Sequence, residues 1–95
     1  MGSNAKQLKW INEQRKFIKN KWGIESTIKI NGHITVTFFN SIGKTWNCHF
    51  ASSPSDNRSI RNQISIMKCG LRENFNIDSN SSDFTMQMYR GSMFK

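Results

Sequence analysis

The segment from residue 24 to residue 50 constrains the fold most, because the apolar side chains of its three runs lie on alternate positions, with Ser26 as the one polar residue among them. That period is typical of β-strands with one buried and one exposed face. Turn signals at 31–32, an Asn-Gly pair, and at 40–43 separate the runs. The shared apolar face carries Ile24, Ile28, Ile34, Val36, Phe38, Trp46, Cys48 and Phe50. The sequence therefore predicts three short antiparallel strands.

The first turn decides which side chains of the first strand are buried. A two-residue Asn-Gly loop would turn Ile28 toward the polar face of the sheet. A longer turn, with Gly32 in the left-handed region and a bulge, instead aligns Ile28 with Ile34 on the apolar face. Burial of Ile28 favours the bulged turn, and in that register we expect Lys29 to lie opposite His33.

Amphipathic segments flank the strands on both sides. A first helix is expected over Asn4–Trp22, capped by its first residue and stopped by Gly23. A second is expected over 53–74, because a serine that can cap it precedes a proline and apolar residues then recur at helical intervals. A chain of 95 residues has room for one domain. We predict an α+β domain over 1–77, in which two helices cover one face of a three-stranded antiparallel sheet.

Residues 78–95 form an extension whose structure the pattern leaves open. Phe84 to Tyr89 alternates again, so it could be a fourth strand at the sheet edge. The same segment could instead bind a protein partner, or remain a frayed tail. The residues that a partner would contact are Phe84, Met86, Met88 and Tyr89.

Positive charge is the strongest functional signal in the sequence. Fourteen Lys and Arg residues against six Asp and Glu give a net charge of +8, which is typical of proteins that bind polyanions such as nucleic acid. The cations gather on the polar faces of both expected helices, although a solvated charged face is the simpler interpretation. The candidate phosphate-binding residues are Lys9, Lys16, Lys19, Lys29, Arg58, Arg61, Lys68 and Arg72. Phe39, on the open sheet face, is the candidate for stacking against a base.

Two histidines fall on the open face of the predicted sheet, and we expect His49 to pair near Thr35 on the neighbouring strand. An imidazole can exchange a proton with a ribose hydroxyl or a phosphate near neutral pH. His33 and His49, with Lys29 nearby, therefore form a candidate catalytic set for a metal-independent ribonuclease. Ordinary exposed histidines are the alternative. Cys48 should point inward and so cannot join them around a metal ion, and we expect no metal and no cofactor.

Hydropathy and the amino terminus bear on location. No apolar run approaches the length of a membrane span, and no basic and then apolar leader opens the chain. We therefore expect a cytoplasmic protein without a membrane partner.

The predicted order of elements resembles the double-stranded RNA-binding domain and, among its relatives, the HicA family of small toxin ribonucleases. In the first family a Gly-Pro-x-His loop between the first two strands enters the minor groove of RNA, and His33 takes that position without the proline. That family also opens its last helix with a basic cluster, where this chain has Ser53–Arg58 with an acid among them. In HicA-like proteins a Gly-Ser-His sequence opens the second strand and its histidine is catalytic, which Gly32-His33 matches in part.

The resemblance and the charge leave three functions open. The first is binding of nucleic acid, RNA more than DNA, without readout of a specific sequence, because no motif for reading base edges is present. The second is a HicA-like ribonuclease that uses His33. The third is a phage-encoded, protein-binding inhibitor of a host system, acting through the sheet edge or Phe84–Tyr89. The segment Ser53–Leu71 is similar to the last helix of small phage proteins, which bears on the source of the chain and not on its chemistry.

Overall fold

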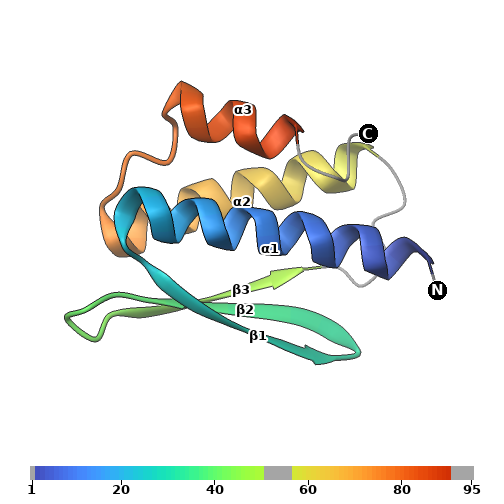
Figure 1. Cartoon of the computed structure of the whole chain (residues 1–95), viewed down its shortest axis with the longest axis horizontal. Helices are drawn as coiled ribbons and strands as arrows, with labels where there is room; N and C mark the ends of the chain where they lie inside the picture. The colour runs from blue at the N-terminus through green and yellow to red at the C-terminus, as the bar shows by residue number, and fades with distance from the viewer. Residues whose placement is uncertain (1, 51–56, 91–95) are drawn as a thin grey trace.

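A computed structural model describes residues 2–50 and 57–90, with side chains from residue 7 and from residue 59 onward in the two parts. Three helices and one antiparallel sheet make up these parts (Figure 1). The elements are α1 (Gly2–Trp22), β1 (Glu25–Asn31), β2 (His33–Phe39), β3 (Thr45–Phe50), α2 (Asn57–Phe75) and α3 (Ser82–Arg90). The predicted α+β class and the helix–sheet–helix order are confirmed, and a third helix is added.

The sheet has the order β1-β2-β3, with both neighbouring pairs antiparallel. Ile28 pairs with Val36 and packs half-buried against the core, so the expected face of β1 is the one turned toward the helices. Asn31 pairs with His33 across Gly32, whose φ is +78°. The predicted pairing of Lys29 with His33 is therefore wrong by two residues. A shift of two leaves every side chain on its own face, so the argument from burial could not distinguish the two registers.

The elements stack in three layers, with the sheet below, α1 and α2 side by side on it, and α3 outermost (Figure 1). Helix α1 packs over β1 and α2 over β3, and these strands are the two edges of the sheet. The core lies between the sheet and the helices. Its fully buried large side chains include Trp10, Ile11, Ile18, Phe38, Ile64, Met67 and Leu71.

The helix ends agree with their sequence signals in part. Helix α1 begins at Gly2, so Asn4 lies inside it and the prediction of Asn4 as its cap is wrong. Gly23 does end α1, with a φ of +72° and its N–H bonded to the Lys19 carbonyl at 2.8 Å. The predicted start of the second helix at Ser53 lies outside the described residues. That helix ends at Phe75, within a residue of the expected position.

Residues 82–90 form helix α3, so of the alternatives for this segment the fourth strand is wrong. Phe84 and Met88 are fully buried, four residues apart, as one face of a helix requires. Phe84 stacks on Phe17 of α1 with ring centroids 5.6 Å apart. The indole Nε1 of Trp10 donates a hydrogen bond to the Met88 carbonyl at 2.9 Å. The segment that alternates in sequence is therefore part of the core.

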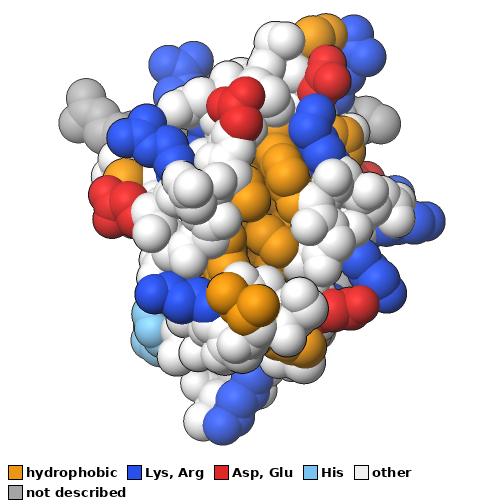
Figure 2. Space-filling model, turned by 90° about the vertical axis from the view of Figure 1, so that its left-hand side faces the viewer, with side chains coloured by type: hydrophobic (Ala, Val, Ile, Leu, Met, Phe, Trp, Pro, Cys, Tyr) orange, Lys and Arg blue, Asp and Glu red, His pale blue; other side chains and the backbone are white. Residues whose placement is uncertain are grey.

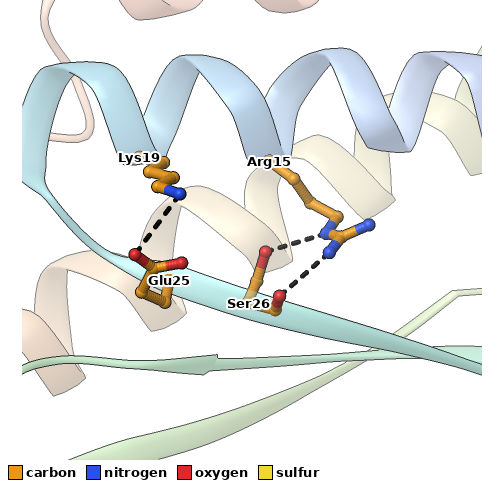
Figure 3. Close-up of polar contacts among 4 residues, drawn as sticks. All are labelled: Arg15, Lys19, Glu25 and Ser26. Carbon is orange, nitrogen blue, oxygen red and sulfur yellow. Dashed lines mark hydrogen bonds and ion pairs between the residues drawn. The ribbon is translucent and has the colours of Figure 1, made fainter.

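Polar contacts fasten α1 to the edge strand β1 (Figure 3). Arg15 donates through Nε to the Ser26 hydroxyl at 2.8 Å and through Nη2 to the Ser26 carbonyl at 2.9 Å. Lys19 forms an ion pair with Glu25 at 3.4 Å. These bonds occupy a backbone carbonyl of an edge strand, which would otherwise be open to another chain. Within the described parts of the chain, no helix is long and apolar enough to cross a bilayer.

Candidate nucleic-acid interface

The face of the sheet opposite the helices is uncovered and polar. Both α1 and α2 lie on the other face, where Ile28, Val36 and Cys48 point (Figure 1). All the side chains on the open face are exposed or half-buried. They include Thr27, Lys29, Asn31, His33, Thr35, Thr37, Phe39, Asn47 and His49. Hydroxyl, amide, imidazole and ammonium groups thus share one accessible surface.

The β1–β2 end of this face contains a hollow of about 630 Å³. Its lining residues are Lys29, Asn31, His33, Thr35, His49 and Phe50. Lys29 and His49 flank Thr35 on the two neighbouring strands, so all three form a row across the sheet. His33 lies two residues along β2 and is the diagonal neighbour of both, about 7–8 Å away. The sheet therefore brings both histidines and one lysine to one site, although the register differs from the expected one.

A hydrogen bond orients one of the two imidazoles. Nδ1 of His49 lies 3.2 Å from the hydroxyl oxygen of Thr35, as expected from the predicted pairing of these residues. The bond occupies Nδ1 and leaves Nε2 for a ligand. One row further along, the Thr37 hydroxyl donates to Oδ1 of Asn47 at 2.7 Å. These cross-strand bonds fix side chains on an otherwise mobile surface.

The stacking candidate lies apart from the histidines. Phe39 is half-buried and ends β2, beside Glu25 and Thr45. Six residues separate it from His33 along one strand, which corresponds to roughly 20 Å. A ligand that contacts both would have to follow the strand across the whole sheet.

The basic residues of the two long helices do not form one surface. Lys9, Lys16 and Lys19 are exposed on α1, which covers the β1 edge. Arg61 and Arg72 are exposed on α2, which covers the β3 edge. The basic faces therefore flank the molecule on opposite sides. The Arg58 side chain lies outside the described residues.

The end of the molecule between these sides is not markedly basic. Figure 2 looks onto it from the left of Figure 1 and shows a strip of hydrophobic side chains. Lys and Arg side chains surround the strip, but Asp and Glu side chains lie among them. Local ion pairs such as Lys21 with Asp83, at 3.4 Å, reduce the field there. Positive charge is thus divided among separate regions.

The two thiols are unsuited to nucleophilic chemistry. Burial raises the pKa of Cys48 to about 12. Cys69 is exposed, but its thiol donates to a Glu73 carboxylate oxygen at 3.3 Å, and this bond and the negative charge raise its pKa. The sequence signal for this acid partner is the four-residue spacing of Cys69 and Glu73 on one helix. Across the described segments, no three His, Cys, Asp or Glu residues gather as a metal site.

Sequence reasoning missed several polar residues, some on the surface and some buried. Asn31 lines the hollow, although its pattern indicated only a turn. Gln7 and Gln14 are buried on α1, although the sequence pattern identifies the buried face of this helix from apolar residues alone. Asn80 lines a cleft against α2, which no sequence period could reveal.

The order of helix, three antiparallel strands and helix is compatible with a double-stranded RNA-binding-domain-like fold. Comparison of the chain with protein-family models, with curated proteins and with solved structures found no match.

Proposed function

We propose that this protein binds RNA, with the open sheet face as the principal contact surface and the basic helix faces as flanking contacts. The observation that supports it best is the hollow where Lys29, His33 and His49 meet without a carboxylate in its lining. A phosphate needs cations and hydrogen-bond donors, and this hollow supplies both. The net charge of +8 adds an attraction that acts at longer range.

Single-stranded RNA is the form that suits this surface. Unstacked bases present edges and faces that a flat polar sheet can contact, whereas duplex RNA is contacted mainly through its backbone. Hydroxyl and amide groups of Thr37 and Asn47 lie between the hollow and the aromatic ring of Phe39. A strand running along β2 would meet cations, polar groups and an aromatic ring in turn. The resemblance to double-stranded RNA-binding domains supports RNA as the polymer, without the basic cluster that grips a duplex.

The test is binding of fluorescein-labelled RNA followed by anisotropy. A single strand, a duplex of the same length and a DNA strand of the same sequence are compared at 50 and 200 mM salt. Binding to single-stranded RNA should be the tightest, and should fall at least tenfold at the higher salt, because cations released from the backbone drive it. Equal and salt-independent affinity for all three, or no binding, would overturn the proposal.

A second function, cleavage of the bound RNA, is favoured by the shared position of two imidazoles. One imidazole would accept the proton of a ribose 2′-hydroxyl as its oxygen attacks phosphorus. The other would donate a proton to the 5′-oxygen as the P–O5′ bond breaks, which leaves a 2′,3′-cyclic phosphate and a 5′-hydroxyl. Lys29 would contact the phosphate oxygens, whose charge grows in the transition state.

This second function has its own test. RNA and a copy with a single 2′-deoxyribose at the cleaved position are incubated with the protein, and products are identified by mass spectrometry. Cyclic phosphate should form only with the ribose, and both His33→Ala and His49→Ala should abolish it while RNA is still bound. If the variants cleave as the parent does, the ribonuclease hypothesis fails and RNA binding is unaffected.

A further inference from the structure

A second polar site lies on the opposite side of the molecule from β1, between α2 and the chain that leads to α3. It is a cleft of about 220 Å³. Its lining residues are Ser65, Lys68, Cys69, Arg72 and Asn80. The first four recur at helical spacing on one stripe of α2, and Asn80 comes from the connection that rises from α2 to α3 (Figure 1). The cleft thus joins two segments of the chain.

Hydrogen bonds hold the connection in place over α2. Ser79 is fully buried, and its hydroxyl donates to the Lys68 carbonyl at 2.6 Å. Asn76 has a φ of +54°, and its N–H bonds to the Arg72 carbonyl at 2.9 Å, so the chain reverses direction immediately after α2. Asn80, one residue beyond the anchored Ser79, is therefore held beside the helix. Because these contacts hold the connection against α2, both sides of the cleft belong to the packed structure.

The groups around the cleft are complementary to an anion. Lys68 gives one ammonium hydrogen to the Thr85 hydroxyl at 3.1 Å and has two left. Arg72 is exposed and makes no ion pair with any residue that the structure describes. Ser65 and Asn80 add a hydroxyl and an amide donor. No carboxylate lines the cleft itself. The nearby Glu73 accepts from Cys69 and keeps its single negative charge, against the two positive charges of Lys68 and Arg72.

We propose that this cleft binds a phosphate group, held by Arg72, Lys68, Ser65 and Asn80. A guanidinium and an ammonium group would neutralise its charge, and the two neutral donors would meet its remaining oxygens. That the phosphate belongs to a nucleic acid rests on the proposed function. In a nucleic acid it is either a terminal phosphate or an internal phosphodiester. Binding would also link α2, the connection and α3, because Lys68 contacts Thr85 of α3 as well.

The first experiment uses inorganic phosphate alone and does not depend on RNA. Amide shifts of the full chain are followed by NMR during titration with phosphate, against sodium chloride at equal ionic strength. Saturable shifts are expected at residues lining the cleft. Arg72→Ala should weaken binding roughly tenfold or more, since a charged hydrogen bond is lost. Arg90→Ala removes an exposed arginine from α3, outside the cleft lining, and should leave the affinity for phosphate unchanged.

Asn80→Ala provides a second variant, because it removes a donor from the connection without altering α2. It should weaken phosphate binding several-fold while circular dichroism and the melting temperature stay as in the parent. Phosphate should raise the melting temperature of the parent but not of Arg72→Ala. Shifts that follow ionic strength alone, or equal effects of Arg72→Ala and Arg90→Ala, would overturn the proposal.

Two labelled oligonucleotides then distinguish the source of the phosphate. One carries a 5′-phosphate and the other a 5′-hydroxyl on the same RNA. Tighter binding of the first, lost in Arg72→Ala, supports a terminal phosphate. Equal binding of both, weakened by Arg72→Ala, supports an internal one. If neither RNA binds but inorganic phosphate does, the proposed function fails and the phosphate site stands.

Discussion

The indole ring of Trp46 on β3 lies directly against the backbone of Gly70 in α2. A methyl group at Gly70 would come within 2.0 Å of Cζ2 of the ring. The ring cannot easily move away, because it stacks on Phe38 with centroids 6.0 Å apart and planes 15° from parallel. This contact accounts for a glycine in the interior of a helix, and it holds α2 close to the sheet.

Gly70→Ala should therefore destabilise the protein, although alanine is the better helix former by about 1 kcal/mol. Overpacking against Trp46 should outweigh that gain and lower the free energy of unfolding by about 1–3 kcal/mol. Urea denaturation followed by circular dichroism measures the difference. In a Trp46→Ala background the ring is absent, so the same substitution should be neutral or stabilising. A stabilising Gly70→Ala in the parent would show that the contact is looser than described.

Because α3 packs into the core, we expect alanine substitutions at two of its apolar residues to lower the stability of the protein by unequal amounts. Phe84 is fully buried, whereas Met86 is 50 % exposed. Phe84→Ala should cost about 3–5 kcal/mol of stability, and Met86→Ala less than about 0.5 kcal/mol. Thermal unfolding of both variants provides the comparison. Small and equal effects would indicate that α3 is not part of the core.

Gln14 is buried on α1, and neither its side-chain oxygen nor its nitrogen has a hydrogen-bond partner in the described structure. Replacing a buried, unsatisfied amide with an apolar side chain of similar shape removes a desolvation cost. Gln14→Met should therefore raise the free energy of unfolding by about 1–2 kcal/mol. Lys9→Met, an exposed change on the same helix, should have little effect. A destabilised Gln14→Met would mean that the amide makes a bond which the structure does not show.

The bond from Cys69 to Glu73 predicts an unusual pH dependence for an exposed thiol. The carboxylate stabilises the protonated thiol, so the pKa of Cys69 is raised and less thiolate is present at a given pH. Alkylation by iodoacetamide at pH 8 should be slower than for a free cysteine. Glu73→Gln removes the negative charge, lowers the pKa and should speed the reaction several-fold. Cys48 is buried and should stay unmodified in the native protein, so the measured rate is that of Cys69. Equal alkylation rates in the parent and in Glu73→Gln would contradict the contact between Cys69 and Glu73.

The sequence predicted the parts of the fold that a local period determines. Alternation identified the three strands and their buried faces, and it placed His49 beside Thr35. It could not choose between registers two residues apart, which is why Lys29 was paired with the wrong residue. The apolar residues at 84, 86 and 88 satisfied a strand period, yet 84 and 88 also share a helix face, and only packing against α1 decided between them.

In the candidate sites, too, the sequence predicts the positions that a local period determines but not those that depend on tertiary packing. Both histidines were expected on the open sheet face because a strand period places them there. The opposed positions of the two basic helices follow from which sheet edge each one covers, and that depends on tertiary packing. Likewise, the course of the chain from Asn76 to Ser81 determines where Asn80 lies, and that course has no periodic signal.

The most direct test of RNA binding at the open sheet face compares two single-lysine variants. Lys29→Ala removes a cation from the hollow, whereas Lys44→Ala removes an exposed cation that lies outside its lining, near the β2–β3 turn. Affinity for single-stranded RNA is measured by anisotropy from 50 to 200 mM salt. Lys29→Ala should weaken binding and reduce the slope of log K against log salt by about 0.7, the loss of one phosphate contact, while Lys44→Ala retains both values. Equal behaviour of the two variants would contradict the assignment of the open sheet face as the RNA-binding surface.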